Sequence, residues 1–63
     1  MTARDRQVLE LVANRGAVRV PEVASATGLS NAEALDALIE LEGGGLLVAS
    51  VFRITADGRE AAR

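Results

Sequence analysis

Two carboxylates one helical turn apart, Asp36 and Glu40, come nearest in this sequence to a catalytic pair by type and spacing. General acid–base catalysis needs such groups in a pocket, where burial or a neighbouring charge separates their pKa values. The pattern of residues 31–42 instead predicts a convex helix that carries both side chains on its exposed face. We therefore expect that the pair is not catalytic and that the chain is not an enzyme.

The three consecutive glycines at 43–45 suggest a different chemistry, that of a phosphate-binding loop. Such a loop opens a helix and carries a Lys and a Ser or Thr, whereas these glycines follow a helix and lack both. The chain also has no Cys and no His, which excludes zinc fingers, disulfides, thiol nucleophiles and His-based metal sites. We therefore expect no metal and no cofactor.

Composition limits the remaining classes of function. The 63 residues allow one small domain, 1–63. A formal net charge of −2 argues against a strongly basic nucleic-acid clamp, and a single aromatic residue cannot build a base-stacking platform. No apolar run approaches the roughly 18 residues of a membrane span, and no signal-peptide pattern is evident. These features predict a soluble, cytoplasmic protein without membrane contact.

Hydrophobic spacing and capping residues predict the elements of the first half of the chain. Thr2 is a plausible N-cap for a helix over 3–14. The apolar stripe of this helix is predicted to consist of Val8, Leu11 and Val12, widened by Leu9. Alternating apolar and polar residues at 17–20 predict a very short strand. A second helix is expected over 21–27, because it begins with a proline and is followed by a glycine.

The second half contains the strongest local pattern in the chain. Ser30 as N-cap and Glu33 three residues later form a capping box at the start of a helix over 31–42. Glycines 43–45 exceed what a helix end requires and suggest a loose hinge. The β-rich run 46–55 predicts a hairpin with its turn near Ala49 and Ser50. Its inward-facing side chains are predicted to be Leu46, Val48, Phe52 and Ile54. Residues 55–59 resemble the capped start of a last helix that runs out at Arg63, which the fold prediction counts as a final helical turn.

This order of elements resembles the winged helix-turn-helix superfamily over nearly the whole chain. The stretch 27–30, Thr-Gly-Leu-Ser, is similar to the turn of many of its repressors, and 54–60 resembles the strand-to-helix step of MarR-like regulators. The stretch 28–47 is similar to the C-terminal winged helix of the DNA-processing protein DprA. The resemblance implies a small α+β winged helix-turn-helix with three helices and a short β-hairpin wing. It also implies a DNA-binding module in transcription regulation or DNA processing.

In that superfamily the helix at 31–42 is the one expected to enter the major groove, but its outer face is acidic. At 100° per residue, the face predicted to be buried contains Ala34, Ala37, Leu38 and Leu41. The opposite face presents carboxylates where a DNA reader presents Arg, Lys, Asn or Gln, namely Glu33, Asp36 and Glu40. Asp36 and Glu40 also repel each other, with no local partner to offset the repulsion.

Leu35 and Ile39 lie beside this acidic strip, away from the centre of the buried face. Two placements are possible for them. They either wrap onto the strands of the hairpin, or form an exposed apolar seam that suits a protein partner or a second copy.

The first functional hypothesis is binding of double-stranded DNA. Arg19 and Arg53 would contact phosphates, and Ser30 and Asn31 would lie nearest the bases. For the two arginines and Asn31, the alternative is a solvated surface role. Residues 20–52 carry five acidic and no basic side chains, so binding would be weak or conditional. Because one copy offers a single half-site, specific binding would need a homodimer or a larger protein.

The second hypothesis belongs to a different class of function. The domain would be a protein-interaction or dimerisation module that does not bind DNA. Its contact surface would consist of Leu35, Asp36, Ile39 and Glu40.

Overall fold

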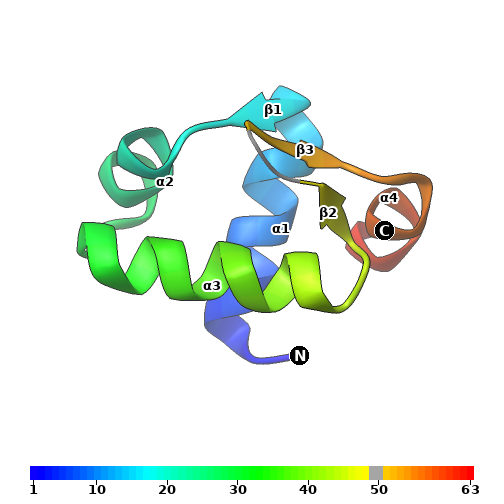
Figure 1. The fold of residues 1–63 in the computed structure, drawn as a ribbon, viewed down its shortest axis with the longest axis horizontal. Coiled ribbons are helices and arrows are strands. Elements are labelled where there is room, and N and C mark those ends of the chain that lie inside the picture. Colours follow the sequence, from blue (N-terminus) through cyan, green and yellow to red (C-terminus); the bar gives the residue numbers. More distant parts are fainter. Residues whose placement is uncertain (49–50) are drawn as a thin grey trace.

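A computed structural model describes residues 1–48 and 51–63 of the chain as an α+β domain, as the sequence predicts. Within these residues, four helices and three short strands follow one another (Figure 1). In chain order they are α1 (Ala3–Arg15), β1 (Ala17–Val18), α2 (Val20–Thr27), α3 (Asn31–Gly43), β2 (Leu47–Val48), β3 (Phe52–Ile54) and α4 (Ala56–Ala62). The prediction of three helices is therefore wrong, because the capped stretch after Thr55 forms a fourth helix, α4. None of the described helices is long and apolar enough to cross a membrane.

Side-chain hydroxyls begin three of the helices. Thr2 accepts a hydrogen bond from the backbone N–H of Asp5 at 3.1 Å, which starts α1. Ser30 accepts from the N–H of Glu33 at 3.1 Å, and Glu33 accepts in return from the N–H of Ser30 at 3.0 Å. The predicted capping box is thus confirmed. The fourth helix forms because the hydroxyl of Thr55 accepts from the N–H of Gly58 at 2.9 Å.

The three strands form one antiparallel sheet in the order β1-β3-β2. Ala17 pairs with Arg53 and Val18 with Phe52, while Leu47 pairs with Ile54 and Val48 with Arg53. The strand predicted over 17–20 is shorter than expected. Val20 instead begins α2, because the Glu22 carboxylate accepts from the N–H of Arg19 at 3.2 Å and fixes the helix start there.

The glycine run closes α3 with a hydrogen-bonded turn, where the sequence suggested a loose hinge. The N–H of Gly45 donates to the carbonyl of Glu42 at 2.9 Å, and the N–H of Leu46 donates to the carbonyl of Leu41 at 3.0 Å. Gly45 has φ of +79°, the left-handed conformation that this Schellman arrangement requires. Only one of the three glycines therefore has a conformational reason to be there.

This turn also determines which side of β2 faces the core. Leu46 completes the turn, so the strand begins one residue later than predicted. Leu47 is buried, whereas Val48 is 54% exposed. The predicted inward position of Val48 is therefore wrong, because a shift of one residue exchanges the faces of a strand. Leu46 is partly buried against the core from the turn that precedes the strand. Phe52 and Ile54 are partly buried against the core, as predicted. The predicted turn at 49–50 lies outside the described residues.

The core forms around α1, which packs against α2, α3, α4 and β3. Leu9 is fully buried and Leu11 only partly, so Leu9 lies at the centre of the apolar stripe and Leu11 at its margin, the reverse of the prediction. The buried apolar residues are Val8, Leu9, Val12, Val18, Val23, Ala34, Ala37, Leu38, Leu41 and Leu47.

Candidate functional site

The exposed side of α3 carries the two apolar residues whose placement the sequence left open. Leu35 is 40% exposed and Ile39 is 52% exposed. The expected buried face of Ala34, Ala37, Leu38 and Leu41 is confirmed. Leu35 and Ile39 thus do not wrap onto the strands, and they form an apolar seam one helical turn long on the surface.

A row of carboxylates runs beside this seam, and two of its three members have partners. Glu33 is held by the capping box, and the Ser30 backbone N–H, followed by the Ser30 side chain, lowers the pKa of its carboxyl group. Glu40 accepts a hydrogen bond from the Arg4 guanidinium at 3.1 Å. Among the described residues, Asp36 makes no ion pair.

Arg4 was missed in the sequence because it lies 36 positions from Glu40. Its guanidinium also contacts Asp5 at 3.0 Å, and Asp5 is only 2% exposed. Arg4 therefore neutralises a buried carboxylate on α1 and an exposed one on α3. No local partner offsets the repulsion between Asp36 and Glu40, but Arg4 from another helix pairs with Glu40.

The N-terminal end of α3 presents Ser30 and Asn31. Asn31 is exposed as the first residue of the helix. The hydroxyl and the N–H of Ser30 are both occupied by Glu33. Ser30 is therefore held by the cap, and Asn31 is the polar side chain of this pair that is open to a ligand.

The outer face of the sheet carries Arg53, and Arg19 directly follows the neighbouring strand β1. Arg53 lies on the central strand, and its cross-strand neighbours Ala17 and Val48 are exposed with it. Arg19 follows Ala17 by two residues on extended backbone, with φ −108° and ψ 158°, so its side chain leaves from the same face. We call Arg19, Val48 and Arg53 the basic sheet face.

The other basic residues of the chain differ in their surroundings. Four arginines are held by carboxylates or backbone carbonyls within the domain, namely Arg4, Arg6, Arg15 and Arg63. Within residues 1–48 and 51–63, no carboxylate lies within ion-pair distance of Arg19, Arg53 or Arg59. Arg59 belongs to α4, so the two unpaired guanidinium groups of the sheet are those the sequence singled out for phosphate contacts.

The four residues predicted to contact DNA fall into two groups. Arg19 and Arg53 share the sheet face, whereas Ser30 and Asn31 lie at the end of α3 beside α2. The opposite end of α3 leads into β2 (Figure 1). The four residues predicted for protein interaction lie together on α3.

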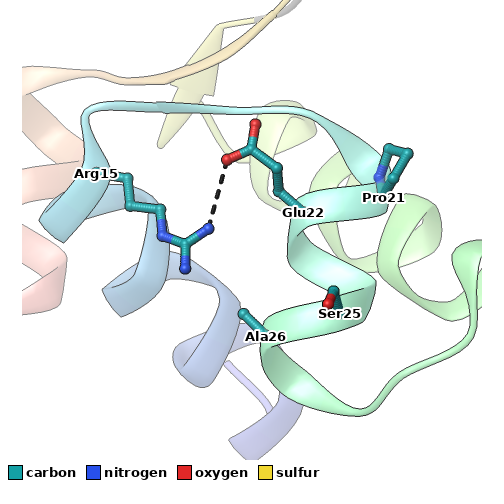
Figure 2. Close-up of a pocket in the computed structure, with 5 residues that line it drawn as sticks. All are labelled: Arg15, Pro21, Glu22, Ser25 and Ala26. Carbon is teal, nitrogen blue, oxygen red and sulfur yellow. Dashed lines mark hydrogen bonds and ion pairs between the residues drawn. The ribbon is translucent and has the colours of Figure 1, made fainter.

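A shallow hollow between α1 and α2 was not predicted from the sequence. It is lined by Arg15, Pro21, Glu22, Ser25 and Ala26 (Figure 2). The Arg15 guanidinium already pairs with the Glu22 carboxylate at 3.4 Å. The hollow therefore offers no unpaired charge to a ligand. Among the described residues, no group of three or more acidic side chains is arranged to hold a metal ion.

The comparisons with known proteins leave the family of this chain open. No family model, no curated protein and no solved structure matches it.

Proposed function

We propose that the chain is a winged helix-turn-helix domain that binds double-stranded DNA weakly, through its phosphates. The order of the elements and the strand order β1-β3-β2 support the fold. In this interpretation α2 and α3 form the helix-turn-helix, joined at Gly28 in left-handed conformation, and β2 and β3 form the wing.

The basic sheet face carries the DNA-binding proposal. Two guanidinium groups on one exposed face, without carboxylate partners among the described residues, are suited to bidentate contacts with phosphate oxygens. The N-terminal end of α3 adds the positive end of a helix dipole and the exposed Asn31 amide. Asn31 would lie nearest the bases in this arrangement.

The charge of α3 restricts the kind of DNA binding. Asp36 on its exposed side has no ion-pair partner among the described residues, and its charge disfavours deep entry into the major groove, where the electrostatic potential is negative. We infer phosphate contacts with little sequence preference, and a role in transcription regulation or DNA processing that depends on a dimer or on a larger protein.

An NMR titration of the ¹⁵N-labelled domain with duplex DNA tests the proposal. We expect amide shifts around Arg19, Asn31 and Arg53 at about 50 mM salt that shrink at about 200 mM salt, because phosphate contacts release counterions. Arg53→Ala should weaken binding more than Arg59→Ala, which removes an exposed arginine from α4. Equal weakening by both variants would point to diffuse attraction and contradict a defined face.

A second candidate function, protein interaction through α3, is favoured by the exposure of Leu35 and Ile39. Apolar side chains flanked by carboxylates suit a protein surface better than a phosphate backbone. In the same titration, amide shifts at Leu35 and Ile39 that follow protein concentration and ignore DNA would support this candidate over the first.

A further inference from the structure

Two surfaces of this domain have opposite charge and a similar design. The acidic helix face, formed by Leu35, Asp36, Ile39 and Glu40, combines exposed apolar side chains with carboxylates. The basic sheet face combines the exposed Val48 with Arg19 and Arg53. The two surfaces therefore carry opposite charges beside exposed apolar side chains, so they are complementary.

We propose that the acidic helix face of one copy docks on the basic sheet face of a second copy, head to tail. In this contact Leu35 and Ile39 cover Val48, and Asp36 meets Arg53 or Arg19. Asp36, Arg19 and Arg53 make no intramolecular ion pair among the described residues, so pairing between the two copies breaks no existing ion pair.

A symmetric contact between two α3 helices is disfavoured by the same charges. It would bring the Asp36 side chains of both copies, which have no ion-pair partner among the described residues, into one interface, where like charges oppose association. The basic sheet face would meet its own arginines in the same way. Charge complementarity thus selects a heterologous contact over a two-fold one.

The size of the domain sets the strength of this contact. The accessible surface of the chain is 3685 Å². Weak interfaces bury less than about 1,200 Å² in total, or about one sixth of this surface on each copy. We therefore expect a dynamic association that appears at high protein concentration.

If the domain binds DNA as proposed above, the second copy and the DNA use the same surface. Both contacts use the basic sheet face, so a copy engaged through Arg53 cannot bind DNA with that face. Self-association would then compete with DNA, and added duplex would dissociate the associated copies. A dimer that supports DNA binding would therefore have to form through another surface.

Sedimentation velocity at protein concentrations from about 20 μM to about 1 mM, the range of weak contacts, tests the association. We expect a sedimentation coefficient that rises with concentration for the natural chain. Asp36→Arg and Arg53→Glu should each weaken association about tenfold, because each replaces an attraction by a repulsion. The control Arg59→Glu alters an arginine outside both faces and should associate like the natural chain.

Mixing the two variants gives the decisive result. Asp36→Arg retains the basic sheet face and Arg53→Glu retains the acidic helix face, so an equimolar mixture should regain association. A natural chain that stays monomeric throughout overturns the proposal, as does a mixture that stays monomeric. Stronger association of Asp36→Arg alone would overturn it in favour of a symmetric α3 contact.

The same variants separate this proposal from DNA binding. Asp36→Arg should lose association and keep or strengthen its DNA-dependent amide shifts, whereas Arg53→Glu should lose both. If the natural chain associates and shows no DNA-dependent shifts, DNA binding alone fails. If it binds DNA and never associates, the head-to-tail contact alone fails.

Discussion

Thr55 connects two parts of the domain, α4 and the turn after α3, through one hydroxyl group. Its oxygen accepts from the N–H of Gly58 at 2.9 Å, and its single proton lies within donating distance of two carbonyls, that of Gly45 at 2.9 Å and that of Leu46 at 3.0 Å. The N–H of Thr55 also donates to Leu46 at 3.1 Å. The stretch 54–60 therefore has a structural role, because it attaches α4 to the turn that follows α3.

Replacing Gly58 in α4 by alanine is expected to destabilise the domain, whereas the same change at most helical glycines stabilises a helix. A Cβ atom there would overlap the Leu46 carbonyl oxygen and lie 2.9 Å from Cγ1 of Ile54. Gly58→Ala should therefore lower the free energy of unfolding by about 1–3 kcal/mol, as overpacking does. Gly43→Ala is the matched control, because open space surrounds this helical glycine, and it should raise stability by about 0.5 kcal/mol. Urea denaturation of both variants checks the prediction, which fails if the two changes have the same sign.

At the scale of elements, the capping box of α3 makes stability depend on pH. The Ser30 backbone N–H and side chain lower the pKa of Glu33, whose ordinary value is 4.5. A lowered pKa in the folded state means that the ionised carboxylate stabilises the fold. This contribution is complete above about pH 4.5 and disappears as the pH falls through the lowered pKa.

Glu33→Gln tests this contribution. The amide still accepts from the Ser30 N–H but does not ionise, so the variant should be less stable than the natural chain at pH 7. The difference should shrink as the pH is lowered below 4.5. Thermal unfolding followed by circular dichroism across pH 3–7 measures it. A difference that stays constant over this range would show that the ionisation of Glu33 does not contribute.

Elements defined by short-range chemistry could be predicted from the sequence. Ser30 and Glu33 define the start of α3 because their hydrogen bonds span three residues. The strand β2 could not be placed in the same way. It has only two residues, and its register depends on the turn through Gly45, whose hydrogen bonds reach back to α3.

A pair of substitutions in β2 tests this register. Leu47→Ala should destabilise the domain by about 2–5 kcal/mol, because it leaves a cavity in the core. Val48→Ala, one residue later, should change stability by no more than about 0.5 kcal/mol, since its side chain is exposed. Chemical denaturation of both variants provides the measurement. A larger loss for Val48→Ala would support the register that the sequence alone predicts.

The sequence predicts the side chains of a candidate surface only where their placement depends on a single helix or strand. The helical period places Asp36 and Glu40 on one face of α3 without knowledge of the fold. The exposure of Leu35 and Ile39 depends on where the strands lie, so the sequence left two placements open. The contact between Arg4 and Glu40 depends on how α1 crosses α3, which no local pattern specifies.

At the scale of the whole molecule, two arginines of α1 have their positive charges engaged in contacts within the domain. Arg6 donates to the carbonyls of Ala61 and Arg63 at the end of α4, at 3.2 and 3.1 Å. Arg4 bridges Asp5 and Glu40. The positive charge that flanks the acidic middle of the sequence is therefore partly used to hold the ends of the chain to the bundle. What remains for a ligand among the described residues is concentrated on the basic sheet face and on Arg59 of α4.

This distribution predicts the salt dependence of DNA binding. Each phosphate contact contributes about −0.9 to the slope of log K against log salt concentration, so contacts from Arg19 and Arg53 predict a slope of about −2. Arg53→Ala should reduce the slope to about −1, and Arg59→Ala should leave it unchanged. Fluorescence anisotropy with a labelled duplex, at several salt concentrations, measures the three slopes. The prediction fails if the natural chain has a steeper slope and every arginine substitution reduces that slope equally. Charge outside the sheet would then govern binding.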